Sequence, residues 1–371
     1  MTFVQQEDRK PVIAILTVAD PYRKFCGNHA NFRDIVKTGK QLGYLVYVVT
    51  TRDLKLNEDQ IQGYIYQTDT KQWVQQWVPL PDVIYNRIPN RGQEKKVFIQ
   101  RKIDACLNHP RIHLFNPFFF NKWKLFSWLK KSGATADFVP ATKRFGTRSA
   151  LAEMLNEHAE LYLKPESGKA GKGIMKLTFD SQDSKPYKLI IQNPERNLIY
   201  KTAKFPLLWR RIRAEMDKTP YIIQQAIRLT RYQCRHFDLR VLVQKTSRGY
   251  WSVTGIGARL AGKKRITTHV PQGGTVEDPR DMLLPTFGPE GAEELLERAR
   301  ASAVTIARQI ERACEQTLGE MSMDLGIDED GKIWFFEANA KPMKFDEPKI
   351  RQKSLQRLFH YSSFLSRTNK V

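Results

Sequence analysis

The segment that most constrains the fold runs from Met323 to Pro342 and predicts a β-hairpin. Two apolar stretches flank the turn residues Glu329-Asp-Gly331, a combination typical of antiparallel strands joined by a tight turn. Glu337 and Asn339 are two positions apart, so their side chains project to the same face, and the hairpin returns Asp324 opposite them. Three oxygen ligands on one face suit Mg²⁺ beside a charged nucleotide. We therefore predict a metal site at Asp324, Glu337 and Asn339 for Mg²⁺, or for Mn²⁺ in its place.

The chain of 371 residues predicts two or three lobes of ~100–200 residues each. Strand and helix signals alternate up to about residue 115, beginning with a buried strand at Val12–Val18, a helix near 31–42 and a second strand at 44–50. We predict an α/β (α+β) fold with an N-terminal α/β lobe at residues 1–115 and a second domain at residues 116–371. Within that domain, short strands and a basic helix predict a mobile antiparallel lid at roughly residues 140–223.

Charge and cysteine content narrow the partners and the setting. Lys and Arg number 61 against 39 Asp and Glu, and the net charge of +22 favours nucleotides, nucleic acid, acidic polymers or anionic lipid as partners. The four cysteines lie far apart without a C-x-x-C pair, which favours a reducing, cytoplasmic setting. The apolar run near the N-terminus has about eight residues, too few to span a bilayer, and we expect no membrane partner. Trp73, Trp77, Trp123 and Trp128 fall in apolar periodic stretches, and we expect them in the core.

The hairpin also carries a recognisable motif. An acid thirteen residues before Glu337-Ala-Asn339, with a D-G turn and the run Ile-Trp-Phe-Phe between them, resembles the closing E-x-N-x-x-P signature of the ATP-grasp superfamily. A second segment, Lys164–Gly173, is a strand ending in lysine and followed by a glycine-rich turn. It is not a Walker loop, because a strand rather than a helix follows it. In an ATP-grasp fold this order of elements places the strand lysine against phosphate and folds the loop over the nucleotide, where glycine permits close approach.

Two further segments resemble the same superfamily. Tyr221–Ile227 resembles the hinge whose main-chain groups read the adenine edge, and Asp238-Leu-Arg240 resembles the D-x-R strand of the glutathione synthetase-like branch. Arg240 and Arg259 would converge on phosphate, where a forked guanidinium holds phosphoryl oxygens in bidentate fashion. A cross-strand pair with Asp238 is the alternative for the arginines, and a basic surface hairpin without a ligand is the alternative for the glycine-rich loop.

Taken over residues 10 to 365, the chain resembles the YheC/YheD family, ATP-grasp proteins described as associated with the spore coat of endospore-forming bacteria. The resemblance implies an ATP-grasp fold preceded by a pre-ATP-grasp lobe. It also implies nucleotide contacts, which by position are Lys122, Lys164, Ser167, Gly168, Gly171, Lys172, Gly173, Gln224, Gln225, Ala226 and Ile227. It further implies catalytic roles for Arg240 and Arg259, and magnesium at Asp324, Glu337 and Asn339.

The sequence supports three functions to different degrees. The leading hypothesis is a ligase that uses ATP to activate an unknown carboxylate for attack by an unknown amine, or by a thiol. The alternative is a coat-associated protein that binds ATP without ligase turnover and uses its positive charge to hold an anionic polymer or a coat component. A nucleic-acid partner is the third and least favoured, on the basic segment 201–213.

Overall fold

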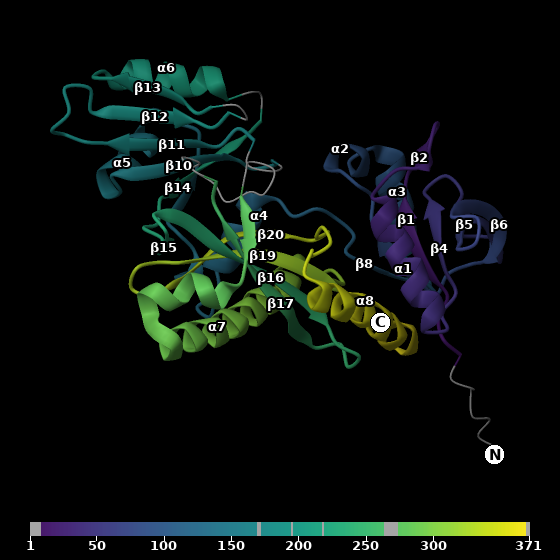
Figure 1. The fold of residues 1–371 in the computed structure, drawn as a ribbon. Helices are drawn as coiled ribbons and strands as arrows, with labels where there is room; N and C mark the ends of the chain where they lie inside the picture. The colour runs from purple at the N-terminus through teal and green to yellow at the C-terminus, as the bar shows by residue number, and fades with distance from the viewer. Residues whose placement is uncertain (1–8, 169–171, 194–195, 217–218, 263–273, 369–371) are drawn as a thin grey trace.

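The computed structural model describes residues 9–168, 172–193, 196–216, 219–262 and 274–368. Within these residues the strands form three large sheets and one two-stranded ribbon, with helices packed on the sheets (Figure 1). The fold is of the mixed α/β class, as predicted. No helix in this part of the chain combines the length and the apolar character needed to cross a membrane.

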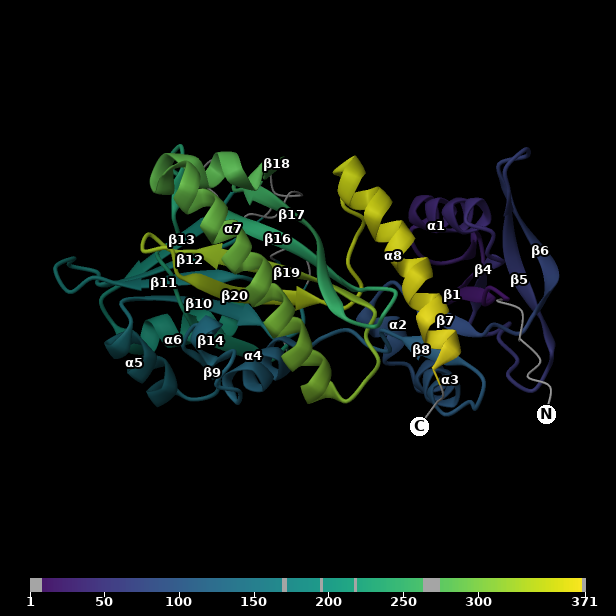
Figure 2. The ribbon, with the colours of Figure 1, turned by 90° about the horizontal axis from the view of Figure 1, so that it is seen from below.

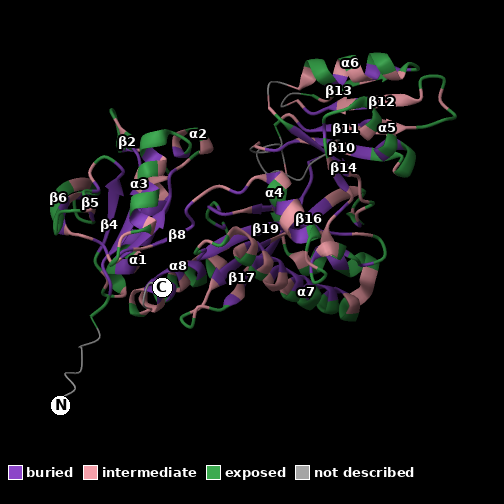
Figure 3. Cartoon of the chain, turned by 180° about the vertical axis from the view of Figure 1, so that it is seen from behind, coloured by how far each residue is buried: buried purple, intermediate pink, exposed green. Residues whose placement is uncertain are grey.

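The first sheet has the order β6-β5-β4-β1-β7-β8, with β1, β4, β7 and β8 parallel. Every residue of β1 and β4 is buried, as expected for parallel strands covered on both faces (Figure 3). Ile13 and Ile15 enter one hydrophobic core, and Ala14 and Leu16 enter the other. Its elements are β1 (Ile13–Thr17), β4 (Val46–Thr50), β5 (Gln60–Gln67), β6 (Gln72–Pro79), β7 (Val83–Asn86), β8 (His113–Phe115), α1 (His29–Gln41), α2 (Arg91–Glu94) and α3 (Val97–Leu107), with the ribbon β2 (Ala19–Asp20) and β3 (Lys24–Phe25).

The C-terminal helix α8 (Pro348–Arg367) completes one core of the first sheet. Phe359 and Leu365 belong to the same cluster of buried residues as Ile13 and Phe32. The close approach needs a glycine, because a Cβ on Gly39 of α1 would come within 2.9 Å of the Phe359 ring. Figure 2 shows α8 between the first and third sheets. The division at residue 115 stays a prediction, but residues far beyond it build the core of the first lobe.

The second sheet is antiparallel, in the order β13-β12-β11-β10-β14-β9. Leu161 and Leu163 of β10 pack into a core beneath α5 and α6. Tyr162 and Lys164 alternate with them and project from the opposite face. The elements are β9 (Thr142–Arg144), β10 (Glu160–Pro165), β11 (Met175–Phe179), β12 (Tyr187–Ile191), β13 (Leu198–Thr202), β14 (Tyr221–Gln225), α5 (Arg148–Glu157) and α6 (Phe205–Glu215).

The third sheet has the order β18-β17-β16-β19-β20, with β15 paired to β16. One face packs on α4 and α7 through the largest hydrophobic cluster, which leaves the other face for polar side chains. The elements are β15 (Arg231–Tyr232), β16 (Arg235–Lys245), β17 (Trp251–Leu260), β18 (Thr275–Glu277), β19 (Glu320–Ile327), β20 (Ile333–Asn339), α4 (Lys122–Lys130) and α7 (Pro279–Cys314), with a short 3-10 helix at Ala136–Phe138.

Several local predictions need correction. Trp77 was expected in the core but is 64% exposed, because it lies on the edge strand β6. Sequence patterns gave no sign of β6 itself or of α3. Helix α7 is interrupted at Gly288, whose φ of 69° is not helical, so a short helix from Pro279 precedes the longer one that ends at Cys314.

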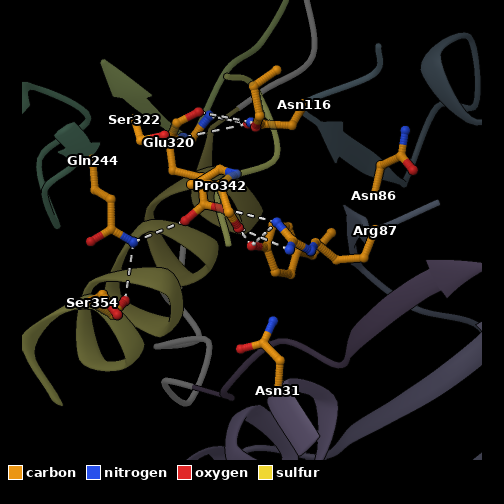
Figure 4. A network of polar contacts seen from close by, with 12 residues as sticks. Asn31, Asn86, Arg87, Asn116, Gln244, Glu320, Ser322, Pro342 and Ser354 are labelled. Carbon is orange, nitrogen blue, oxygen red and sulfur yellow. Dashed lines mark hydrogen bonds and ion pairs between the residues drawn. The ribbon is translucent and has the colours of Figure 1, made fainter. Parts of the chain in front are cut away.

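A buried amide joins the first sheet to the third (Figure 4). Asn116 follows β8 directly and has a φ of 57°, a left-handed conformation that asparagine tolerates better than most residues. Its Oδ1 accepts from the Gly319 N–H at 2.7 Å. Its Nδ2 donates to the Glu320 carbonyl at 2.8 Å and to the carbonyl of Ala340. One side chain therefore ties the end of β8 to the starts of β19 and of the loop after β20.

A buried carboxylate lies beside it. Arg87 Nη1 lies 3.4 Å from Oε1 of Glu320, the Tyr85 hydroxyl donates to the same oxygen, and Gln244 Nε2 donates to Oε2 at 3.2 Å. Burial raises the pKa of Glu320, and the charge of Arg87 acts against that rise. Arg87 Nη2 also donates to the Pro342 carbonyl at 2.9 Å, so the loop after β20 is held against the first sheet.

We expect the substitution Asn116→Ala to lower the free energy of unfolding by about 3 kcal/mol or more. It would leave the Gly319 N–H and two carbonyls unpaired in a dry site, at ~1–3 kcal/mol for each buried unsatisfied group, and would place alanine in a left-handed conformation. Urea unfolding followed by circular dichroism measures the change. The exposed Asn108→Ala is the control, and an equal loss in both variants would contradict the role of Asn116.

Candidate functional site

The predicted metal residues lie together on β19 and β20. Asp324 stands directly opposite Glu337, and Asn339 stands opposite Ser322 on the same pair of strands. All three residues line one cavity of about 640 Å³. Among the described residues no set of three His, Cys, Asp or Glu side chains surrounds a common point. A metal ion here would therefore have two carboxylates and one amide as protein ligands, an all-oxygen set that fits Mg²⁺ completed by phosphate oxygens.

A β-bulge next to this pair shapes the site. The register shifts between Asp324 and Leu325, so Leu325 pairs with Phe335 and Phe336 has no partner opposite it. The Phe336 ring lies over Gly326, where a Cβ would come within 2.4 Å of the ring. The bulge turns consecutive residues, Phe336 and Glu337, toward the same cavity. Regular strand alternation predicts opposite faces for them, which is why sequence reasoning missed Phe336.

Arg259 links Asp238 of the D-x-R strand to Asp324. Arg259 lies on β17 and stands opposite Asp238 of β16. Its Nε is 2.9 Å from Asp238 Oδ1, and its Nη2 is 2.6 Å from Asp324 Oδ2. Burial by itself lowers the pKa of Arg259, but the carboxylates of Asp324 and Asp238 outweigh burial and raise that pKa above its ordinary value. The guanidinium is therefore permanently charged. The cross-strand pair with Asp238 exists, and the same arginine reaches the predicted metal site.

Arg240 also faces the cavity, but in a different setting. Its Nη2 lies 3.5 Å from the Ser322 hydroxyl, and its guanidinium packs 5.6 Å from the centre of the Phe345 ring. The described residues give it no ion pair within 4 Å. Its charge is therefore available to an anion in the cavity, whereas that of Arg259 is shared with two carboxylates.

The two predicted phosphate lysines occupy the space between the second and third sheets. Lys164 Nζ donates to Gln224 Oε1 at 2.6 Å and lies 5.3 Å from the Tyr162 ring and 5.4 Å from the Phe336 ring. Lys122 Nζ lies 2.9 Å from Glu337 Oε1. Burial, with the charge of Lys122, lowers the pKa of Lys164 to about 8, against the opposing effect of Glu337.

The predicted adenine segment lines a second, smaller cavity. This cavity of about 150 Å³ is bordered by Gln224, Gln225, Ala226 and Ile227, together with the Tyr162 and Phe336 rings. The N–H groups of Gln225 and Ala226 already donate to the carbonyls of Ala141 and Glu160. A nucleobase here would therefore meet the carbonyls of the segment and the aromatic rings rather than these two N–H groups. Tyr162 was missed, although its place two residues before Lys164 puts it on the same strand face.

Of the described residues of the glycine-rich loop, only Ser167 and Gly168 border one of the two cavities. Ser167 and Gly168 line the larger cavity, and Arg91 Nη1 donates to the Gly168 carbonyl at 3.4 Å. Lys172 is exposed and lines neither cavity, and Gly173, with a φ of 77°, accepts a hydrogen bond from Tyr221 at 3.0 Å. Gly171 lies outside the described residues.

Part of the wall of the larger cavity was not predicted, namely Pro89, Asn90, Arg91 and Gly92 from the first lobe together with Phe119 and Lys341. Lys341, two residues after Asn339, is buried and forms an ion pair with Glu94 of α2. Its ammonium lies 4.5 Å from the centre of the Phe119 ring, and Glu94 accepts the Phe119 N–H at 2.8 Å. Burial lowers the pKa of Lys341 to about 8, against the effect of Glu94. The sequence showed Lys341 inside the E-x-N-x-x-P motif but gave no sign of a partner 247 residues away.

The two cavities meet at Asp324 and Glu337, which line both of them. A family model described as YheC/D like ATP-grasp matches residues 111–365, more than half of the chain. The chain belongs to the YheC/D-like ATP-grasp family. It is 29% identical over 372 residues to the endospore coat-associated protein YheD of Bacillus subtilis (strain 168), a match that covers 96% of this chain and 79% of that protein.

Solved structures agree on the fold. The ATP-grasp ligase PsnB complexed with minimal precursor, Mg and ADP superposes with a TM-score of 0.53 at 14% identity, covering 95% of this chain and 98% of that one. The D-alanyl-alanine synthetase A from Vibrio cholerae O1 biovar eltor str. N16961 gives a TM-score of 0.52 at 13% identity, covering 96% of each chain. The ATP-grasp fold predicted from the sequence is confirmed.

The lowered pKa of Lys164 predicts a pH-dependent stability in this family member. The pKa is about 8 in the folded chain against 10.5 for an ordinary lysine, so between these values the unfolded chain binds more protons. The wild type should therefore gain stability relative to Lys164→Met as the pH rises from 7 to 10. Urea unfolding of both proteins at each pH measures the difference. A difference in the free energy of unfolding that stays constant from pH 7 to 10 would contradict the lowered pKa of Lys164.

Proposed function

We propose that this chain is a Mg·ATP-dependent ligase that joins a carboxylate to an amine or a thiol through an acyl phosphate. The observation that supports this most is the position of Asp324 and Glu337 on the border of both cavities. A nucleotide in the smaller cavity would direct its phosphates toward these carboxylates, and a substrate in the larger cavity would approach the same point. Bringing two reactants to one point is a large part of catalysis in phosphoryl transfer.

The residues have separate roles in this proposal. Magnesium ions held by Asp324, Glu337 and Asn339 would neutralise charge on the phosphates. Lys122 and Lys164 would bind phosphate oxygens from the side of the second sheet. The arginines described above, Arg240 and Arg259, would hold the phosphoryl group from the side of the larger cavity.

The reaction has two balanced steps. A substrate carboxylate oxygen attacks the terminal phosphorus of ATP, and the bond to the ADP oxygen breaks. The nitrogen or sulfur of the acceptor then attacks the acyl carbon and loses a proton, and inorganic phosphate leaves. Neither step requires a side-chain nucleophile, and the cavity walls described above supply charge and position instead.

The ion pairs of the site are compatible with this chemistry. Glu337 is paired with Lys122, and Asp324 is paired with Arg259. A metal–nucleotide complex carries both signs of charge. Its phosphate oxygens can pair with Lys122 and Arg259, while its metal ion binds the two carboxylates. Exchange of partners keeps the buried charges compensated, which a lone phosphate or a lone metal ion would not do.

The second candidate is an ATP-binding or structural protein of the spore coat without ligase turnover. The net charge of +22 favours it, as does similarity to a protein named as endospore coat-associated. The partner would be an anionic polymer or another coat component, and the chain would be made in the cytoplasm and associate with the coat. Nucleic acid is a weaker choice of polyanion.

We expect Glu337→Ala to reduce ATP-dependent ADP formation by on the order of a hundredfold or more, because it removes a metal ligand and frees the Lys122 ammonium. The assay supplies Mg·ATP with pools of carboxylic acids and of amines and measures ADP and phosphate. Glu329→Ala, an exposed acid in the turn of the same hairpin, is the control and should keep full activity.

The same assay separates the two candidates. If the wild type binds a fluorescent ATP analogue but releases no ADP with any acid and amine pool, the coat-protein alternative is favoured over the ligase. If the wild type turns over ATP and Glu337→Ala does so equally well, the assignment of the metal pair is wrong.

A further inference from the structure

The start of α3 carries an exposed surface that the proposed reaction does not use. Val97 and Phe98 are 66% and 63% exposed, and they are flanked by the exposed side chains of Lys95, Lys96 and Arg101. We call these five residues the α3 surface. Isolated exposed apolar residues are ordinary, but an adjacent pair framed by cations offers both apolar contact and charge to a partner.

The charge of the α3 surface is not neutralised within the chain. Among the described residues, Lys95, Lys96 and Arg101 take part in no ion pair within 4 Å. Glu94, the acid next to them in sequence, is buried and paired with Lys341. Asp104 is exposed further along the same helix, so it balances part of the charge at the far end only. The surface therefore complements a partner that carries negative charge.

The α3 surface follows closely, along the chain, on residues that line the larger cavity. Asn90, Arg91 and Gly92, at the start of α2, line that cavity, and α2 ends at Glu94, one residue before Lys95. Four residues of helix rise by only ~6 Å, so the surface and the cavity mouth are neighbours. Figure 1 shows α2 on the side of the first lobe that faces the second sheet. An extended chain bound to the α3 surface can thus place its next residues in the cavity.

We propose that the α3 surface docks an acidic polypeptide, whose carboxylate or amine enters the larger cavity as a substrate. This rests on the proposed ligase function, because the peptide would supply one of the two groups to be joined. A polypeptide brings carboxylates for the lysines and apolar side chains for Val97 and Phe98 within a few residues. A nucleic-acid backbone has no apolar side chains to cover Val97 and Phe98, and a membrane surface is too flat to extend into the cavity.

Binding of a defined probe tests the proposal without any turnover. The probe is a fluorescein-labelled peptide of twelve residues alternating glutamate and leucine, titrated with the wild type in the absence of nucleotide and followed by anisotropy. We expect saturable binding that weakens when NaCl is raised from 50 to 300 mM. A peptide with glutamine in place of glutamate should bind at least tenfold more weakly.

Two double variants and one matched control locate the site. Lys95→Glu with Lys96→Glu, and separately Val97→Ser with Phe98→Ser, should each weaken peptide binding about tenfold or more. Arg210→Glu with Arg213→Glu, an exposed basic pair on α6, changes the net charge by the same amount and should bind like the wild type. All these side chains are exposed, so thermal unfolding should confirm that each variant is folded.

The outcomes separate this proposal from the proposed function. An equal loss in the α6 control would overturn the α3 surface as the site, since net charge alone would then explain binding. Tighter binding of single-stranded DNA or of phosphatidylglycerol vesicles through the same α3 residues would overturn the polypeptide as the partner. Acid- and amine-dependent ADP formation that persists without peptide binding would reject the docking proposal and keep the ligase. Peptide binding without any turnover would reject the ligase and the substrate role of the peptide, and would keep the α3 surface only as a polypeptide-binding site.

Discussion

The carboxylate of Glu320 is buried between the first and third sheets, in contact with Tyr85 and Arg87 at the end of β7 and with Gln244 of β16 (Figure 4). Stranding such a charge in a dry interior costs several kcal/mol, so Arg87 on the first sheet cannot move away from the third without a large penalty. Arg87 also holds the Pro342 carbonyl, and Asn116 adds the amide bridge beside it. The larger cavity lies between these elements, so its width depends on this junction.

The buried charged groups that line the two cavities also need partners of opposite charge, but not all of them have one. Asp324 and Glu337 have cations as partners, and Arg259 is shared between two carboxylates. Lys164 instead has an amide oxygen and two aromatic faces around its ammonium, and its pKa falls to about 8. Glu320 is compensated by protein alone and serves the fold. Lys164 is compensated poorly, which leaves it suited to a phosphate group.

Local pattern predicted much of the framework. The strands expected at residues 12–18 and 44–50, observed as β1 and β4, and the closing hairpin of β19 and β20 lie where apolar pattern and turn residues place them. The edge strand β6 and the helix α3 were not predicted, because β6 places pairs of apolar residues between glutamines instead of alternating them, and α3 mixes apolar and charged residues. Trp77 was misplaced for a related reason, since hydrophobicity does not tell an edge strand from a central one.

The sequence by itself determined that Asp324, Glu337 and Asn339 share one face of a hairpin, because strand alternation and a D-G turn are local properties of twenty residues. It also determined that Lys164 ends a strand before a glycine-rich turn. Only the tertiary structure decided that Phe336 turns into the smaller cavity, that Lys341 pairs with Glu94, and that α8 completes the first core. A bulge breaks the alternation on which sequence reasoning relies, and contacts between residues hundreds of positions apart leave no local period in the sequence.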